Sequence, residues 1–143
     1  MSIEVKPSIS LKSLLVPSKE LTIEYPGAPG FEVKLCYLSK ETMINIRKKA
    51  TTTKIRAGRE VEEKLDEELF QDLFVSATVK SWSGLKYKYL ATMVAVDLSG
   101  ISDLEETLEF NKDNALMLMR NSNDFDNWIA SVVGDLANFQ KNK

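Results

Sequence analysis

A chain of 143 residues, 43% of them hydrophobic and 28% charged, has the length and composition of one globular domain and not of a disordered segment. Its formal net charge of −2 gives no overall attraction to nucleic acid or to an anionic membrane. The sequence has no histidine and one cysteine, Cys36, which excludes the commonest general base, an intrachain disulfide and a cysteine-based zinc site.

The N-terminal residues 1–19 are expected to form a loosely held arm outside a single helical domain that spans residues 20–140. The arm contains Pro7 and Pro17, and its apolar residues have helical spacing over a stretch too short for a stable isolated helix. It lacks the pattern of a secretion signal, and no apolar run approaches the roughly 20 residues of a membrane span. We therefore expect no membrane association and a location in the cytoplasm in which the protein is made.

Two short segments of alternating apolar and polar residues predict a β-hairpin at about 21–37. A loop rich in proline and glycine, residues 26–30, separates the two segments. The alternating apolar residues are Leu21, Ile23, Tyr25, Phe31, Val33, Leu35 and Tyr37. Because a hairpin alone is marginally stable, its apolar face is expected to lie on helices.

The middle of the chain predicts two helices joined by a polar segment. Ser39 is a good N-cap for a helix over about 40–50, and Asp66 begins a second helix for which Gly84 is a plausible C-cap. Between them, residues 51–64 have weak periodicity, which predicts a long loop or a mobile short hairpin.

The C-terminal half predicts further helices. Residues 85–96 are apolar and favour a helix, residues 97–110 form an acidic, irregular connection, and Asn111 and Ser122 cap the last two helices. The last helix carries one continuous apolar stripe of about four turns. The stripe comprises Phe125, Trp128, Ile129, Val132, Val133, Leu136 and Phe139. The predicted fold is therefore α+β, mainly α-helical, with a small N-terminal β-hairpin on a core of about four to five helices.

The sequence has no recognisable catalytic or nucleotide-binding motif. It lacks the G-x-S-x-G elbow, the P-loop and the G-x-G-x-x-G fingerprint. Acidic residues cluster at helix starts, where they serve the helix dipole more often than catalysis. We therefore expect a protein that is not an enzyme and needs no cofactor. Separately, we expect Trp82 and Trp128 to be buried anchors of the helical core.

A basic run lies at residues 47–59 and is followed at once by acidic residues. The run has no aromatic residue for base stacking, and the acids oppose a polyanion, so nucleic acid is a less favoured partner than protein. The basic run could instead be an ordinary solvated loop. The C-terminal stripe could instead be packed in the core. The candidate protein-binding residues are Arg47, Lys48, Lys49, Lys54 and Arg56 from the run, and Phe125, Ile129, Val132, Leu136 and Phe139 from the stripe.

Three segments of the chain resemble the tail assembly chaperones of long-tailed bacteriophages, the siphophages. They are FEVKLCYLSKETMINIRKKATTTK at 31–54, WSGL at 82–85 and NALMLMRNSNDFDNWIASVVGDLANF at 114–139. The likeness covers most of residues 20–140 and rests on apolar and capping residues, not on a catalytic signature.

The resemblance implies a non-enzymatic helper of viral tail assembly. Such a chaperone binds the tape measure protein and keeps it soluble until the tail tube polymerises around it. It acts in the host cytoplasm and is absent from the mature virion. The resemblance also implies self-association, with the tail tube protein and a frameshifted longer form of the chain as further partners.

Two other functions stay open at this point. A structural tail completion or tube-joining protein would persist in mature particles. A small nucleic-acid-binding regulator would use the basic run at 47–59.

Overall fold

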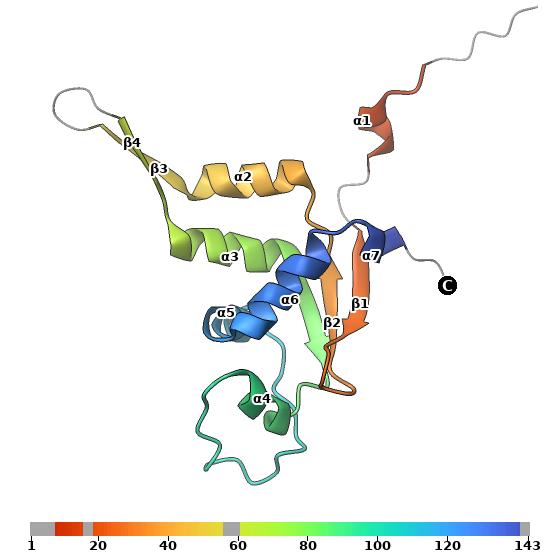
Figure 1. Cartoon of the computed structure of the whole chain (residues 1–143), viewed down its shortest axis with the longest axis vertical. Coiled ribbons are helices and arrows are strands. Elements are labelled where there is room, and N and C mark those ends of the chain that lie inside the picture. Colours follow the sequence, from red (N-terminus) through yellow and green to blue (C-terminus); the bar gives the residue numbers. More distant parts are fainter. Residues whose placement is uncertain (1–7, 16–18, 56–60, 141–143) are drawn as a thin grey trace, which may run out of the picture.

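The computed structural model describes residues 8–15, 19–55 and 61–140, and it confirms the predicted α+β class (Figure 1). The helices are α1 (Leu11–Leu14), α2 (Lys40–Ala50), α3 (Glu67–Thr78), α4 (Tyr87–Met93), α5 (Lys112–Asn121), α6 (Asn123–Val133) and α7 (Ala137–Gln140). The strands are β1 (Glu20–Glu24), β2 (Glu32–Cys36), β3 (Thr51–Ile55), β4 (Val61–Leu65) and β5 (Val79–Ser83). None of the helices in the described ranges is long and apolar enough to cross a membrane.

The predicted hairpin is confirmed as β1 and β2, and it belongs to a larger antiparallel sheet in the order β1-β2-β5. Ile23 pairs with Val33, and Val33 pairs with Trp82 on the other side of β2. Because side chains alternate along a strand, Val33 and Leu35 both point into the protein, where they are fully buried. The central strand is thus the apolar base of the fold.

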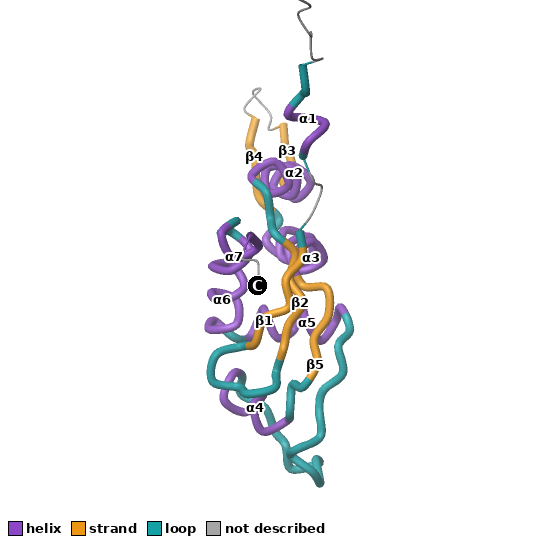
Figure 2. The backbone as a smooth tube through the Cα atoms, turned by 90° about the vertical axis from the view of Figure 1, so that its right-hand side faces the viewer, coloured by secondary structure: helices purple, strands orange, loops and turns teal. Residues whose placement is uncertain are grey.

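The helices cover this base in a fixed arrangement. α3 and α6 both contact β2, and α5 packs on α3 and α6. In Figure 2, α6 and α7 lie on one side of the sheet, and α1 extends beyond the end of the molecule that holds α2. The hydrophobic core lies between these helices and the sheet, whereas α1 buries none of its residues.

The four predicted N-caps are confirmed, because each capping oxygen accepts a hydrogen bond from the backbone N–H three residues later. These bonds are Thr42 N to Ser39 Oγ (3.1 Å), Leu69 N to Asp66 Oδ1 (3.1 Å), Asn114 N to Asn111 Oδ1 (2.8 Å) and Phe125 N to Ser122 Oγ (3.1 Å). The bounds of α2 also match the prediction of 40–50.

The second predicted helix is shorter than expected. α3 ends at Thr78, and the chain passes directly into β5, so Trp82 lies on a strand and Gly84 is not a helix C-cap. Thr78 and Val79 are β-branched, a residue type that favours strands, and Val79 pairs with Leu35 of β2. Pairing with β2 therefore ends a helix that local periodicity alone would continue.

Gly84 has a different role, at a close approach of two chain segments. Its φ of 76° lies in the left-handed region, and a Cβ there would overlap the carbonyl oxygen of Gly30. A glycine without a Cβ lets the end of β5 pass beside the loop that joins β1 to β2.

The polar segment at 51–64 contains a short hairpin, one of its two predicted forms. β3 and β4 pair in the register Thr51 opposite Leu65 through Ile55 opposite Val61, and the hairpin extends from the ends of α2 and α3 (Figure 1). Residues 56–60 lie outside the described ranges.

The predicted helix at 85–96 is only partly present, as α4. The neighbouring connection is tied back to this segment, since Tyr87 N–H donates to Glu106 O (2.9 Å) and Leu108 N–H donates to Leu85 O (2.8 Å). These bonds give partners to backbone groups at and before the start of α4, which lack partners within the helix.

The prediction of one continuous C-terminal stripe is wrong. α6 ends at Val133 with Gly134 as its C-cap, and a short separate helix, α7, follows. The carboxylate of Asp135 accepts a hydrogen bond from Ala137 N (3.0 Å), which favours a new helix start over continuation of α6.

The two tryptophans differ in burial. Trp82 is 8% exposed, its ring lies edge-on to those of Phe31 and Phe110, and its Nε1–H donates to Leu108 O at 3.0 Å. Trp128 is half-buried and packs edge-on against Tyr25, with ring centroids 4.9 Å apart.

We predict that Trp82→Ala lowers the free energy of unfolding by about 3–5 kcal/mol, the range for large core truncations. Trp128→Ala should cost clearly less, because part of its ring is already in solvent. Urea denaturation followed by circular dichroism measures both costs. Equal losses, or a larger loss at Trp128, would contradict this ranking.

A glycine series tests the close approach at Gly84. Gly84→Ala should destabilise more than Gly27→Ala, whose φ of 85° imposes strain of about 1–2 kcal/mol but whose surroundings are open. Gly100→Ala is the control, because it combines open space with an ordinary φ and should be nearly neutral. Thermal melting in this order supports the contact, and matching losses at positions 84 and 27 would show that it does not matter.

Candidate protein-binding groove

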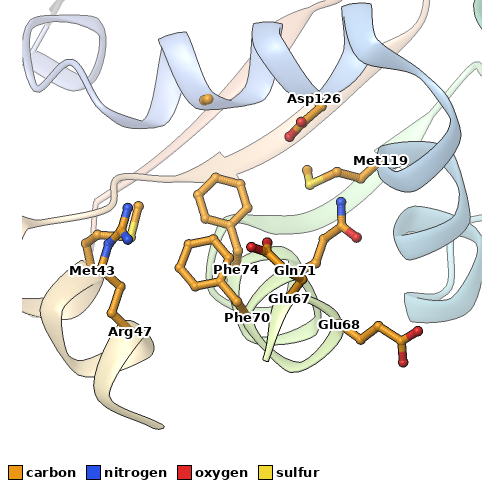
Figure 3. A pocket seen from close by; sticks show the side chains of 10 residues that line it. Met43, Arg47, Glu67, Glu68, Phe70, Gln71, Phe74, Met119 and Asp126 are labelled. Carbon is orange, nitrogen blue, oxygen red and sulfur yellow. The ribbon is translucent and has the colours of Figure 1, made fainter. Parts of the chain in front are cut away.

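A groove with a volume of about 390 Å³ lies where α2, α3, α5 and α6 meet (Figure 3). This volume falls in the range of about 300–1,000 Å³ that is typical of ligand pockets. The lining residues are Met43, Arg47, Glu67, Glu68, Phe70, Gln71, Phe74, Met119, Asp126 and Ala130.

The floor of the groove is apolar. Phe70 and Phe74 lie one turn apart on α3, project into the groove in Figure 3, and stack with centroids 6.3 Å apart. Met43 reaches in from α2 and Met119 from α5. Methionine side chains are flexible and polarisable, so they adapt to apolar partners of different shape.

The rim of the groove carries both signs of charge. The guanidinium of Arg47 lies over the ring of Phe70, 5.3 Å from its centroid, which holds the cation beside the apolar floor. Glu67 and Glu68 come from the first turn of α3, and Asp126 faces the groove from α6. An apolar floor with a mixed-charge rim suits a short amphipathic segment of another protein.

Asp126 lies in a partly desolvated position at this rim. Burial raises the pKa of its carboxyl above the ordinary value, because leaving water penalises the charged form. The charged carboxylate is therefore more costly in the folded protein than in the unfolded chain.

The other predicted basic residues do not join Arg47 at the groove. Lys48 and Lys49 are exposed on α2, and consecutive helical residues point about 100° apart, so the three cations do not share one face. Lys54 stands opposite Glu62 in the β3–β4 register, away from the groove lining. Arg56 lies outside the described residues.

The predicted C-terminal residues mostly serve the core. Phe125 and Ile129 are fully buried, Val132 is 6% exposed, and none of the three lines the groove, so all three pack in the core. Leu136 is exposed, and Phe139 is half-buried against Tyr37, with ring centroids 5.6 Å apart.

Sequence reasoning missed most of the groove. Its candidate binding residues included Arg47 but not Met43, Phe70, Met119 or Asp126. A usable signal was the face of α3 on which charged and aromatic residues mix at spacings of three and four. That face comprises Glu67, Phe70, Gln71 and Phe74. A helix face meant only for a core would not include the charged and amide side chains.

Within residues 8–15, 19–55 and 61–140, no three acidic or cysteine side chains gather closely enough to hold a metal ion. Comparison with models of protein families, with curated proteins and with solved structures finds no significant match to this chain.

The raised pKa of Asp126 gives a pH prediction. A raised folded pKa means that the folded protein binds the proton more tightly, so stability is lost as pH rises from the ordinary pKa of 3.8 through the folded pKa. Asp126→Asn removes this loss and should stabilise the protein at pH 7, with the difference shrinking below about pH 4. Asp124→Asn, an exposed carboxylate of the same turn, is the matched control. Urea unfolding from pH 3 to 8 measures the difference, and destabilisation by Asp126→Asn at pH 7 would overturn the prediction.

Proposed function

We propose that the protein is a non-enzymatic tail assembly chaperone that binds the tape measure protein and keeps it soluble until the tail tube polymerises. The resemblance of residues 31–54, 82–85 and 114–139 to that family motivates the proposal. The structural observation that supports it is the groove between α2, α3, α5 and α6, which has an apolar floor and a charged rim.

The groove matches the chemistry of a long helical client. A tape measure helix would expose apolar residues at spacings of three and four, which associate non-specifically unless they are covered. Phe70 and Met43 are partly exposed beside the buried Phe74 and Met119, and they offer an apolar contact for such side chains in the helix-in-groove mode. Arg47 on one side and Glu67 on another would favour clients with complementary charges and so set their orientation.

The size of the groove favours weak contacts in many copies. One groove covers a short stretch of helix, and buried area is offset by the loss of freedom on binding, so the affinity of each site is modest. Several copies along one client would cover the seam, and each copy could leave as tube subunits arrive. Self-association, the tail tube protein and a frameshifted longer form belong to the same proposal, as do action in the host cytoplasm and absence from the virion.

Co-expression with the cognate tape measure protein tests the proposal. The chain should keep the client in the soluble fraction and co-elute with it on size exclusion. Phe70→Gln should weaken the complex by at least about tenfold, because it removes an aromatic anchor from the floor. Leu69→Gln is the matched control, since Leu69 is an exposed apolar residue of the same helix outside the groove, and it should bind normally.

Three outcomes separate the alternatives. A client that is equally soluble with and without the chain, and that forms no complex, would refute the chaperone. A complex unaffected by Phe70→Gln would place binding outside the groove. Detection of the chain by mass spectrometry in purified virions would favour a structural tail protein instead.

A further inference from the structure

Residues 8–15 of the N-terminal arm present apolar side chains that the rest of the described chain does not bury. Ile9, Leu11, Leu14 and Leu15 are 72%, 71%, 62% and 60% exposed. α1 has only four residues, and a helix this short is unstable in water unless other groups pack against it. The arm therefore has the composition of a segment that binds an apolar surface.

An apolar pocket with a volume of about 300 Å³ lies between α4 and α5; we call it the α4/α5 pocket. It is lined by Leu90, Val94, Ala95, Val96, Leu108, Asn114, Met117, Leu118 and Asn121. Val96 and Met117 are exposed, at 40% and 47%, so apolar side chains reach its rim beside the amide of Asn121. Leu104 is another exposed apolar residue, in the connection that follows α4. Exposed apolar residues thus gather at two places, the arm and this pocket.

The charges of the two places are complementary. The stretch 8–19 contains Lys12 and Lys19 and no acidic residue. The chain between Lys88 and Lys112 has no basic residue and carries Asp97, Asp103, Glu105, Glu106 and Glu109.

One of these acids is already paired within the chain. Glu105 bonds to Lys86 at 2.8 Å and to Lys88 at 2.6 Å, which lowers its pKa to about 2. The remaining acids are exposed beside the pocket segments, where they favour the approach of a basic arm.

The arm and the pocket lie toward opposite ends of the molecule. α1 extends from the end at which β1 begins, whereas α4 and its connection form the other end, in both Figure 1 and Figure 2. Residues 15–20 span at most about 17 Å when fully extended, which is no more than the length of a five-residue strand. To enter the pocket of its own chain, the arm would have to use this whole length along the sheet, which favours the pocket of another copy.

We propose that residues 8–15 of one copy bind the α4/α5 pocket of a second copy. This contact joins two different surfaces head to tail, so its repetition forms open chains or closed rings. It leaves the groove at Phe70 and Phe74 free, and it does not depend on any client. The interface is small, and we expect assembly in the micromolar range.

Sedimentation velocity of the full chain from about 5 to 500 µM tests the proposal. Wild type should grow in mass with concentration. The double variant Leu11→Ser, Leu14→Ser and the single variants Met117→Lys and Val96→Lys should each weaken assembly by at least about tenfold. Ile44→Ser is the matched control, because Ile44 is an exposed apolar residue of α2 away from both surfaces, and it should assemble as wild type. Unchanged melting temperatures show that the variants are folded.

Mixing the variants tests the head-to-tail geometry. The arm variant retains its pocket and the Met117→Lys variant retains its arm, so an equimolar mixture should form dimers and nothing longer. Wild type that stays monomeric throughout would overturn the proposal, as would normal assembly by the arm variant. A monomer whose α1 amides resist hydrogen exchange would also overturn it, by showing that the arm binds its own chain. If the chain fails to bind the tape measure protein on co-expression, the expected results of these self-assembly experiments stay the same.

Discussion

The position of Trp82 is the constraint on which the other elements depend. Its ring contacts those of Phe31, Phe110 and Phe125, and its indole N–H donates to the carbonyl of Leu108. One side chain thus joins the residue before the central strand, the segment before α5, and α6. Because β5 continues directly from α3, holding Trp82 in this cluster also fixes where the end of α3 meets the sheet. The face of α3 that forms the floor of the groove is placed by the same contacts.

Features decided by nearest neighbours along the chain were predictable. Alternation identified the hairpin of β1 and β2, and the capping chemistry of Ser39, Asp66, Asn111 and Ser122 located four helix starts. Features decided by distant partners were not. The helical spacing continues past Thr78, but pairing of β5 with β2 ends the helix there. No local sequence pattern predicts that Gly84 lies beside Gly30. The predicted ends of helices were wrong where pairing with a distant strand overrides local propensity.

The same limit applies to the candidate site. Arg47 was identified from its charge, and it lies at the groove because of its contact with Phe70. The groove itself could not be predicted, because an apolar helix face has the same spacing whether another element covers it or leaves it open. Phe125 and Ile129 illustrate the ambiguity, since their spacing suits a binding stripe but the sheet and α5 bury them. The sequence predicts which helix faces are apolar, but the packing of several helices decides which of these faces remains accessible.

The central claim is that a client binds at the groove and that the α4/α5 pocket is a separate surface. Methionine methyl groups report both, since Met43 and Met119 line the groove and Met117 lines the pocket. NMR spectra of the full chain with ¹³C-labelled methionine methyls should be recorded during titration with a soluble helical segment of the cognate tape measure protein. We expect the methyl signals of Met43 and Met119 to shift and that of Met117 to stay unchanged. Shifts confined to Met117, or none at any of the three under conditions where the client segment binds, would contradict it.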